Sequence, residues 1–246
     1  MKKRIIIIAA VIAAAFVSCQ KDDTIRYGNV TMGNIVDGEF ISDQGNTFHI
    51  AEQACEGNLM EFKRAIINCD VLRETSEGVY DIRLLEMLRV LAKDPVAASS
   101  AVEEDILVED PVSIYNLWYA GGYINMYVVF PIKENSGTTH LINLVYDDSA
   151  ETEGKYSFTL RHNAYGDKLT DADRNLILAG AYVSFYVADL IKEDEAKVNI
   201  SWKWYKSAET GLTSTIEDNT TEFDWKRGAF EQAPSAIGLK SPKAVR

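Results

Sequence analysis

The chain has 246 residues and carries 25 basic against 37 acidic side chains, for a formal net charge of −12 at pH 7. This excess of negative charge repels phosphate backbones and argues against a nucleic acid as a partner. Apolar residues make up 47% of the sequence and five residues are proline, which argues against a largely disordered chain and predicts a packed core.

The N-terminus has the pattern of an export signal. Three basic residues within residues 1–4 precede the run 5–17, which has no polar side chain and is shorter than the about 20 apolar residues of a membrane-spanning helix. This pattern, ending in the small residue Ser18, is typical of a secretory signal peptide over residues 1–18. The next residue, Cys19, resembles the acylation site of bacterial lipoproteins. An ordinary secretory peptide with an incidental cysteine is the alternative.

Acylation of Cys19 is expected to anchor the mature chain in a membrane. Each buried methylene contributes about 0.8 kcal/mol, and bacterial lipoproteins carry more than one acyl chain, so the anchor is expected to last. Residues 19–27 are expected to form a tether between the lipid anchor and the folded body. The first residues of this tether resemble the signal that sends lipoproteins of Bacteroidota to the outer face of the outer membrane. A solvated spacer is the alternative. The residues of this expected export signal are Gln20, Lys21, Asp22 and Asp23.

Residues 28–96 are predicted to form a small barrel of short β-elements. Residues 30–36 are a strand candidate, and "FISDQGNTFHI" places the turn-forming residues 43–46 between two alternating arms, which predicts a hairpin. In "RAIINCDVL" the alternation predicts a strand that buries one face. The residues on that face are Ala65, Ile67, Cys69 and Val71.

The last element of this half has two interpretations. After a turn at residues 76–78, Leu84, Leu88 and Leu91 have helical spacing, although a final strand is the alternative. Barrels of this kind bind single-stranded nucleic acids in other proteins, but residues 28–96 hold six basic against twelve acidic side chains. The charge of the predicted barrel therefore also argues against a nucleic acid.

Besides Cys19, the mature chain has two cysteines, Cys55 and Cys69. Because the expected location lies outside the cytosol, a disulfide between them is allowed. Closing a loop of this length would contribute about 3 kcal/mol. Two small buried thiols are the alternative with equal support, because the sequence does not show that the side chains meet.

The second half is predicted to be an antiparallel β-sandwich over residues 112–230, with a tail at 231–246. Two Asp-Pro steps, a run of small residues and an acidic cluster interrupt the periodicity around the linker, residues 97–111. A short helix capped by residues 170–173 is expected within the sandwich. The predicted strands are 113–120, 123–130, 140–147, 155–161, 181–189 and 198–206.

The order of these segments resembles the NigD-like lipoproteins of Bacteroidota. In the first half the likeness is carried by "GNVTMGNIVDGEFISDQGNTFHI", "RAIINCDVL" and "YDIRLLEMLRVLAKDP". In the second half it is carried by "SIYNLWYAGGYINMYVVF", "HLINLVYDD" and above all "FTLRHNAYGD". The resemblance implies an all-β fold, in which a small OB-like barrel is followed by an antiparallel β-sandwich. It implies fold and location, and no chemistry.

The polar stretch "LRHNAYGD" allows two interpretations. At the end of a strand its side chains either converge on a ligand or metal, or serve the turn itself. In the second case Asn163 and Asp167 hydrogen-bond the backbone of a tight turn, and Gly166 supplies a positive φ. The turn explains each residue type without a ligand and is the favoured interpretation. The candidate residues are Arg161, His162, Asn163 and Asp167.

Other signals of chemistry are weak. The sequence has no Gly-x-Ser-x-Gly nucleophile motif, and His49 and His140 lack paired ligand spacing. The acidic run 146–154 lacks the spacing of a calcium loop. No catalytic residue, metal or cofactor is therefore expected. Trp202 and Trp204 share one face of a strand, where exposed rings would stack on a sugar, but core packing is the commoner fate of tryptophan.

The sequence therefore predicts a non-enzymatic outer-membrane lipoprotein, attached through its N-terminal lipid, that binds a protein or a glycan. The family's association with a bacteriocin operon adds an alternative, a self-protection or accessory factor for a secreted toxin. A hydrolase is the least favoured function. It would require two acids, or an acid and His162, within hydrogen-bonding distance in an exposed cleft.

Overall fold

The computed structural model describes residues 25–26, 31–101, 103–149, 154–170, 176–208 and 211–228. The expected signal peptide, the acylation site Cys19 and the export residues 20–23 lie outside this described part of the chain. The same holds for residues 171–173 of the expected helix cap. Within the described part, no helix has the length and apolar character needed to cross a membrane.

The first half forms a closed five-strand barrel, as predicted. The hydrogen-bonded order is β1-β5-β2-β3-β4-β6, and β5 also pairs with β6, which closes the sheet on itself. A 3₁₀ turn, Leu59–Glu61, precedes β5. The strands are β1 (Ile25–Arg26), β2 (Thr31–Val36), β3 (Glu39–Ser42), β4 (Thr47–Gln53), β5 (Arg64–Ser76) and β6 (Val79–Arg89).

The barrel interior follows the predicted alternation on β5. Ala65, Ile67, Cys69 and Val71 are all at most 4% exposed and belong to one apolar cluster with Phe40 and Phe48 of the predicted hairpin. The neighbouring segment, β6, is a strand, so the helix predicted from the leucine spacing is wrong.

A break in register explains the leucine spacing on β6. Asn68 pairs with Glu86 but Cys69 pairs with Leu84, so one extra residue lies between these pairs. A bulge of this kind reverses which residues face which side. Leu84 therefore faces the barrel interior, whereas Leu88 packs in a separate cluster on the outside.

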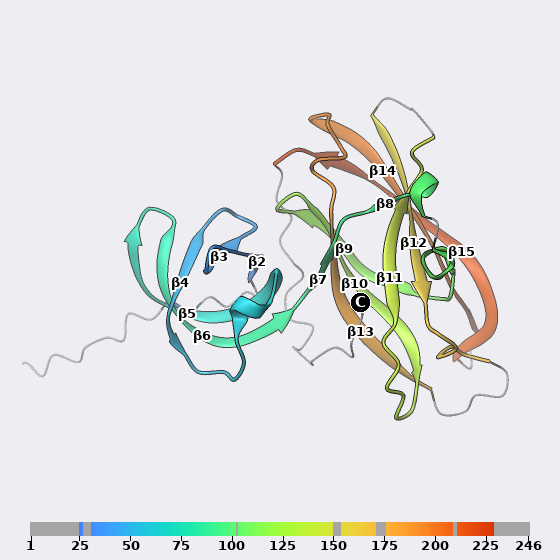
Figure 1. Cartoon of the computed structure of the whole chain (residues 1–246), viewed down its shortest axis with the longest axis horizontal. Coiled ribbons are helices and arrows are strands. Elements are labelled where there is room, and N and C mark those ends of the chain that lie inside the picture. The colour runs from blue at the N-terminus through green and yellow to red at the C-terminus, as the bar shows by residue number, and fades with distance from the viewer. Residues whose placement is uncertain are drawn as a thin grey trace, which may run out of the picture.

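The second half is a two-layer β-sandwich (Figure 1). One sheet has the order β7-β13-β10-β9 and the other β15-β14-β12-β11-β8. The first sheet consists of β7 (Leu91–Lys93), β9 (Ser113–Ala120), β10 (Tyr123–Lys133) and β13 (Leu176–Tyr186). The second consists of β8 (Val96–Ala97), β11 (Leu141–Tyr146), β12 (Lys155–Asn163), β14 (Glu195–Ala208) and β15 (Gly211–Lys226).

All six predicted strands of the sandwich are present, and β9 has the predicted bounds. Strand β15 was not predicted, although it has 16 residues. It lies at the edge of its sheet, and its side chains are mostly exposed. Within the expected linker, a 3₁₀ turn (Ala98–Ser100) and the short helix α1 (Glu104–Leu107) follow β8.

The barrel packs against the outer face of the β7-β13-β10-β9 sheet, and Figure 1 shows the two bodies side by side. Trp118 and Tyr182 lie on this face with their rings edge to face, 6.4 Å apart. A single residue, Val90, separates β6 from β7, and it is buried in this contact. The barrel contributes Met32, Ile66, Leu88 and Val90, and the sandwich contributes Trp118, Ala120 and Tyr182.

Candidate functional site

The "LRHNAYGD" stretch forms a tight turn at the end of β12. The backbone N–H of Tyr165 donates to Asn163 Oδ1 at 2.9 Å, and Gly166 has φ +86°. Asp167 accepts from the backbone N–H of Lys133 at 2.6 Å, which ties the turn to the end of β10. Asn163 and Asp167 thus bond backbone groups, although the partner of Asp167 lies on β10 of the other sheet.

Two histidines meet behind this turn. His162 Nε2 lies 2.9 Å from His140 Nδ1, and His140 Nε2 lies 3.3 Å from Asp167 Oδ2. At the other end, His162 Nδ1 lies 2.9 Å from the carbonyl oxygen of Pro111. His140 directly precedes β11, and the antiparallel pairing of Leu141 with Asn163 places it beside His162. The pair was not predicted from the sequence, because its two members are 22 residues apart.

The contacts of His162 and His140 with Pro111 and Asp167 form a series that we call the histidine row. When both rings are neutral, this row has fewer N–H protons than its contacts require. Three contacts in series, from Pro111 oxygen to Asp167 oxygen, need three N–H groups, because both end groups are acceptors. Two neutral imidazoles supply only two. When both rings are neutral, one of the three contacts therefore lacks a proton. A third proton would complete the row.

Burial opposes that third proton. It lowers the pKa of His162 to about 4, and the neighbouring His140 acts in the same direction. Burial also lowers the pKa of His140, although Asp167 partly opposes the shift. For Asp167, burial raises the pKa, but hydrogen bonds from Ser136 and from the Lys133 backbone outweigh it and lower the pKa. At neutral pH the row therefore consists of two neutral rings and one carboxylate.

This cluster cannot receive a substrate directly. His140 and His162 are each 1% exposed and Asp167 is 3% exposed. Beside them, Asp110 accepts from the backbone N–H of Ala164 at 3.0 Å and pairs with Lys168. The arrangement fixes the turn and the preceding chain to β12, which is a structural task.

The remaining sequence candidates are dispersed. Arg161 forms an ion pair with Glu109, and burial lowers its pKa. Cys55 and Cys69 are both free thiols, so the structure has two thiols and not the disulfide that was the alternative. Burial raises the pKa of Cys69 to about 12, which leaves it protonated and unreactive. Trp202 is partly buried against the sandwich core.

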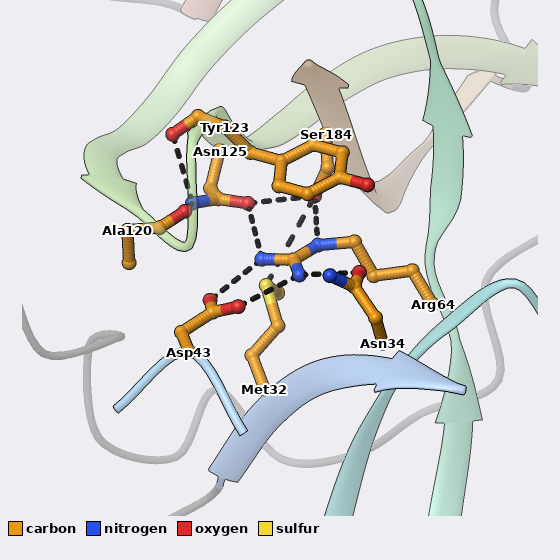
Figure 2. A network of polar contacts seen from close by, with 8 residues as sticks. All are labelled: Met32, Asn34, Asp43, Arg64, Ala120, Tyr123, Asn125 and Ser184. Atoms are coloured by element: carbon orange, nitrogen blue, oxygen red, sulfur yellow. Dashed lines mark hydrogen bonds and ion pairs between the residues drawn. The ribbon is translucent and has the colours of Figure 1, made fainter. Parts of the chain in front are cut away.

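A second polar cluster lies between the barrel and the sandwich, centred on Arg64 at the start of β5 (Figure 2). Its guanidinium donates to Asp43 Oδ1 and Oδ2 at 2.8 and 2.6 Å and to Asn34 Oδ1 at 2.9 Å, all within the barrel. It also donates to Asn125 Oδ1 and Ser184 Oγ of the sandwich, both at 3.0 Å. All five N–H donors of the guanidinium thus have an acceptor.

The geometry around Arg64 is tightly constrained. Figure 2 shows the Tyr123 ring over the guanidinium, whose central carbon lies 4.2 Å from the ring centroid. On the other side, Asp43 contacts Gly121 of the β9–β10 turn so closely that a Cβ there would collide with its carboxylate. The side chains of Arg64 and Asp43 are 0% and 3% exposed. The ion pair itself lies within the barrel, and the remaining hydrogen bonds of Arg64, to Asn125 and Ser184, join the barrel to the sandwich.

Sequence reasoning did not find Arg64. The available signal was a basic residue at the head of the apolar run "RAIIN", where a charge can be buried only with a partner. The partners come from four other segments of the chain, and none of them has a fixed spacing from Arg64.

A surface pocket opens beside the Arg64 cluster, on the solvent side of Tyr123. Its volume is about 280 Å³. It lies where the starts of β5 and β10 meet the ends of β7 and β13. Its lining consists of Lys63, Ala92, Lys93, Asp94, Tyr123 and Tyr186. Among the described residues, no three His, Cys, Asp or Glu side chains are grouped as metal ligands would be.

Fold and site together define a two-domain β-protein in which a buried arginine of a closed barrel donates hydrogen bonds to a β-sandwich. The sequence profile of the NigD-like C-terminal β-sandwich domain matches residues 94–217, half of the chain. The chain belongs to the NigD-like family, which confirms the resemblance and the all-β fold class predicted from sequence.

Solved structures share this fold. A protein of unknown function from Bacteroides vulgatus has a TM-score of 0.59 and 18% identity, covering 86% of this chain and 96% of that one. A NigD-like immunity protein from Bacteroides caccae has a TM-score of 0.56 and 22% identity, covering 79% and 94%. A protein described as a candidate lipoprotein from Bacteroides fragilis has a TM-score of 0.56 and 14% identity, covering 80% of this chain and 96% of that one. A search of the curated proteins finds no match.

Proposed function

We propose that the protein is a non-enzymatic lipoprotein of the outer-membrane surface that binds a ligand through its rigid two-domain body. The observation that carries this proposal is the surface pocket between the barrel and the sandwich that Tyr123 and Tyr186 line, which we call the junction pocket. It is open to solvent, and one of its aromatic walls, Tyr123, is held in place by the buried Arg64 guanidinium. The histidine row, which has the residue types of acid–base catalysis, is closed to solvent.

The lipid anchor is supported by the sequence of the first 23 residues and by the likeness to the candidate lipoprotein of Bacteroides fragilis. We expect the wild-type protein, expressed in a host of the order Bacteroidales, to partition into the detergent phase of a Triton X-114 extract. Cys19→Ala is expected to move it to the aqueous phase, because the acyl chains supply the apolar anchor.

Two further variants complete this experiment. Cys55→Ala removes a cysteine that is not acylated and is expected to leave partitioning unchanged. Replacing Lys21, Asp22 and Asp23 by alanine is expected to preserve the detergent partitioning but to protect the protein from protease added to intact cells. Equal partitioning of wild type and Cys19→Ala would contradict the anchor. Equal protease access in the triple variant would contradict the export signal.

A second function, self-protection against a bacteriocin, is favoured by the likeness to the NigD-like immunity protein from Bacteroides caccae. If the protein confers immunity, a deletion strain becomes sensitive to the culture supernatant of its own parent, and the gene supplied in trans restores resistance. The growth-inhibition zone on a lawn measures this. A deletion strain as resistant as its parent removes the immunity function and leaves the binding function in place.

A further inference from the structure

The junction pocket has two aromatic walls that are held in place before any ligand arrives. The rings of Tyr123 and Tyr186 lie 5.0 Å apart at 60°. Tyr123 rests on the Arg64 guanidinium. Tyr186 rests on the backbone of Gly122, where an added Cβ would lie 2.9 Å from the ring. Walls fixed in this way lose little conformational entropy on binding.

The polar groups of the pocket are of two kinds. The ammonium of Lys93 donates to the Ile142 carbonyl at 3.0 Å and to Asn143 Oδ1 at 2.6 Å, so it is held by the sandwich. The other polar side chains have no hydrogen bond or ion pair with any described residue. These are Lys63, Asp94, Tyr123 and Tyr186. Burial raises the pKa of Tyr123, so its hydroxyl remains a donor at neutral pH.

This set of groups selects one chemical class of ligand. The lining has two ammonium groups, Lys63 and Lys93, and one carboxylate, Asp94; because Lys93 is already bound to two oxygens of the sandwich, the groups left for a ligand are one ammonium and one carboxylate. A wholly apolar ligand would cover both charged groups without pairing them, which costs free energy. Hydroxyl groups both donate and accept, and they satisfy an ammonium and a carboxylate side by side.

We infer that the junction pocket binds a pyranose ring of a carbohydrate, with the C–H face of the ring against Tyr123 and Tyr186 and its hydroxyls on Lys63 and Asp94. The negative face of an aromatic ring attracts the weakly positive C–H groups of a sugar. A volume of about 280 Å³ accommodates one ring, and the opening to solvent lets a longer glycan continue outward. This inference rests on the proposed binding function and names its ligand class and site.

The test uses the mature chain and a panel of methyl pyranosides, namely the glucoside, galactoside, mannoside and N-acetylglucosaminide. Saturation-transfer NMR is expected to show transfer to the C–H protons of one or more of them, and titration gives the affinity. Lys63→Met and Asp94→Asn are each expected to weaken binding by about tenfold to a hundredfold, because each removes a hydrogen bond to a charged group. Both side chains are exposed, so the fold is expected to tolerate these changes.

Tyr115→Ala is the matched control, because Tyr115 lies on the same sheet and is 67% exposed but does not line the pocket. Binding that persists in Tyr115→Ala and is lost in Lys63→Met and Asp94→Asn supports the inference. The absence of binding to any of the four pyranosides overturns it, as does unchanged affinity in the two pocket variants. Unchanged affinity would still leave a binding lipoprotein with its site elsewhere, and detergent partitioning decides the anchor independently.

Discussion

Arg64→Met is expected to lower the free energy of unfolding by about 3–5 kcal/mol, because it leaves the carboxylate of Asp43 buried without its countercharge. The side chain of Asp43 is 3% exposed, so water cannot replace the lost partner without movement of the barrel on the sandwich. The acceptors on Asn125 and Ser184 lose a donor at the same time. Urea unfolding followed by tryptophan fluorescence measures the change, since Trp118 lies in the domain contact.

Arg73→Met is the matched control for this experiment. Arg73 lies on the same strand, β5, and pairs with Asp81 at 2.6 Å, but its side chain is 73% exposed. Exposed ion pairs contribute about 0–1 kcal/mol, so this variant is expected to cost less than about 1 kcal/mol. Equal costs for the two variants would contradict the larger contribution expected of the buried Arg64 cluster.

Acid is expected to destabilise the protein by about 3 kcal/mol between pH 6.5 and pH 4, through His162 alone. The pKa of His162 is about 4 in the folded chain, against about 6.5 in an unfolded one. In this window the unfolded chain binds a proton that the folded chain does not, so the free energy of unfolding falls as the pH falls. At pH 4 His162 is half protonated in the folded chain, so its contribution becomes constant about one pH unit lower. The pKa of His140 is also lowered, so it acts with the same sign.

Urea unfolding at half-unit pH intervals tests this expectation, with two variants beside the wild type. His162→Gln keeps a side-chain donor for the Pro111 carbonyl but does not titrate, so the fall is expected to shrink. His49→Gln replaces a histidine whose side chain is 43% exposed and is expected to leave the fall in place. NMR titration of the ring C–H signals gives a second measurement. A His162 signal that titrates near pH 6.5 in the folded protein would contradict the prediction.

The strands with a buried face could be predicted from the sequence. Strand β9 has the predicted bounds, and the alternating residues of β5 face the barrel interior, because burial of one face imposes a two-residue period. Strand β15 was not predicted, because at the sheet edge most of its side chains meet solvent and carry no apolar period. The leucines of β6 suggested a helix because a bulge shifts the period within one strand.

The polar clusters were harder to predict than the fold. The turn at Asn163 could be inferred because its donor and acceptor are two residues apart. The partner of His162 is 22 residues away, and Arg64 reaches Ser184 across 120 residues. Such pairs depend on strand register and on how the two domains dock, and neither quantity is encoded in local spacing. A single sequence shows the residue types of these clusters but not which side chains contact one another.

The single residue between β6 and β7 has a consequence for how the chain withstands force and proteolysis. With only Val90 as a connection, and that residue buried, the domains have no flexible hinge that a protease can cut or a pull can extend. A load transmitted through a membrane tether would act on the barrel and the sandwich together. We then expect the barrel and the sandwich to unfold in one event and not one after the other.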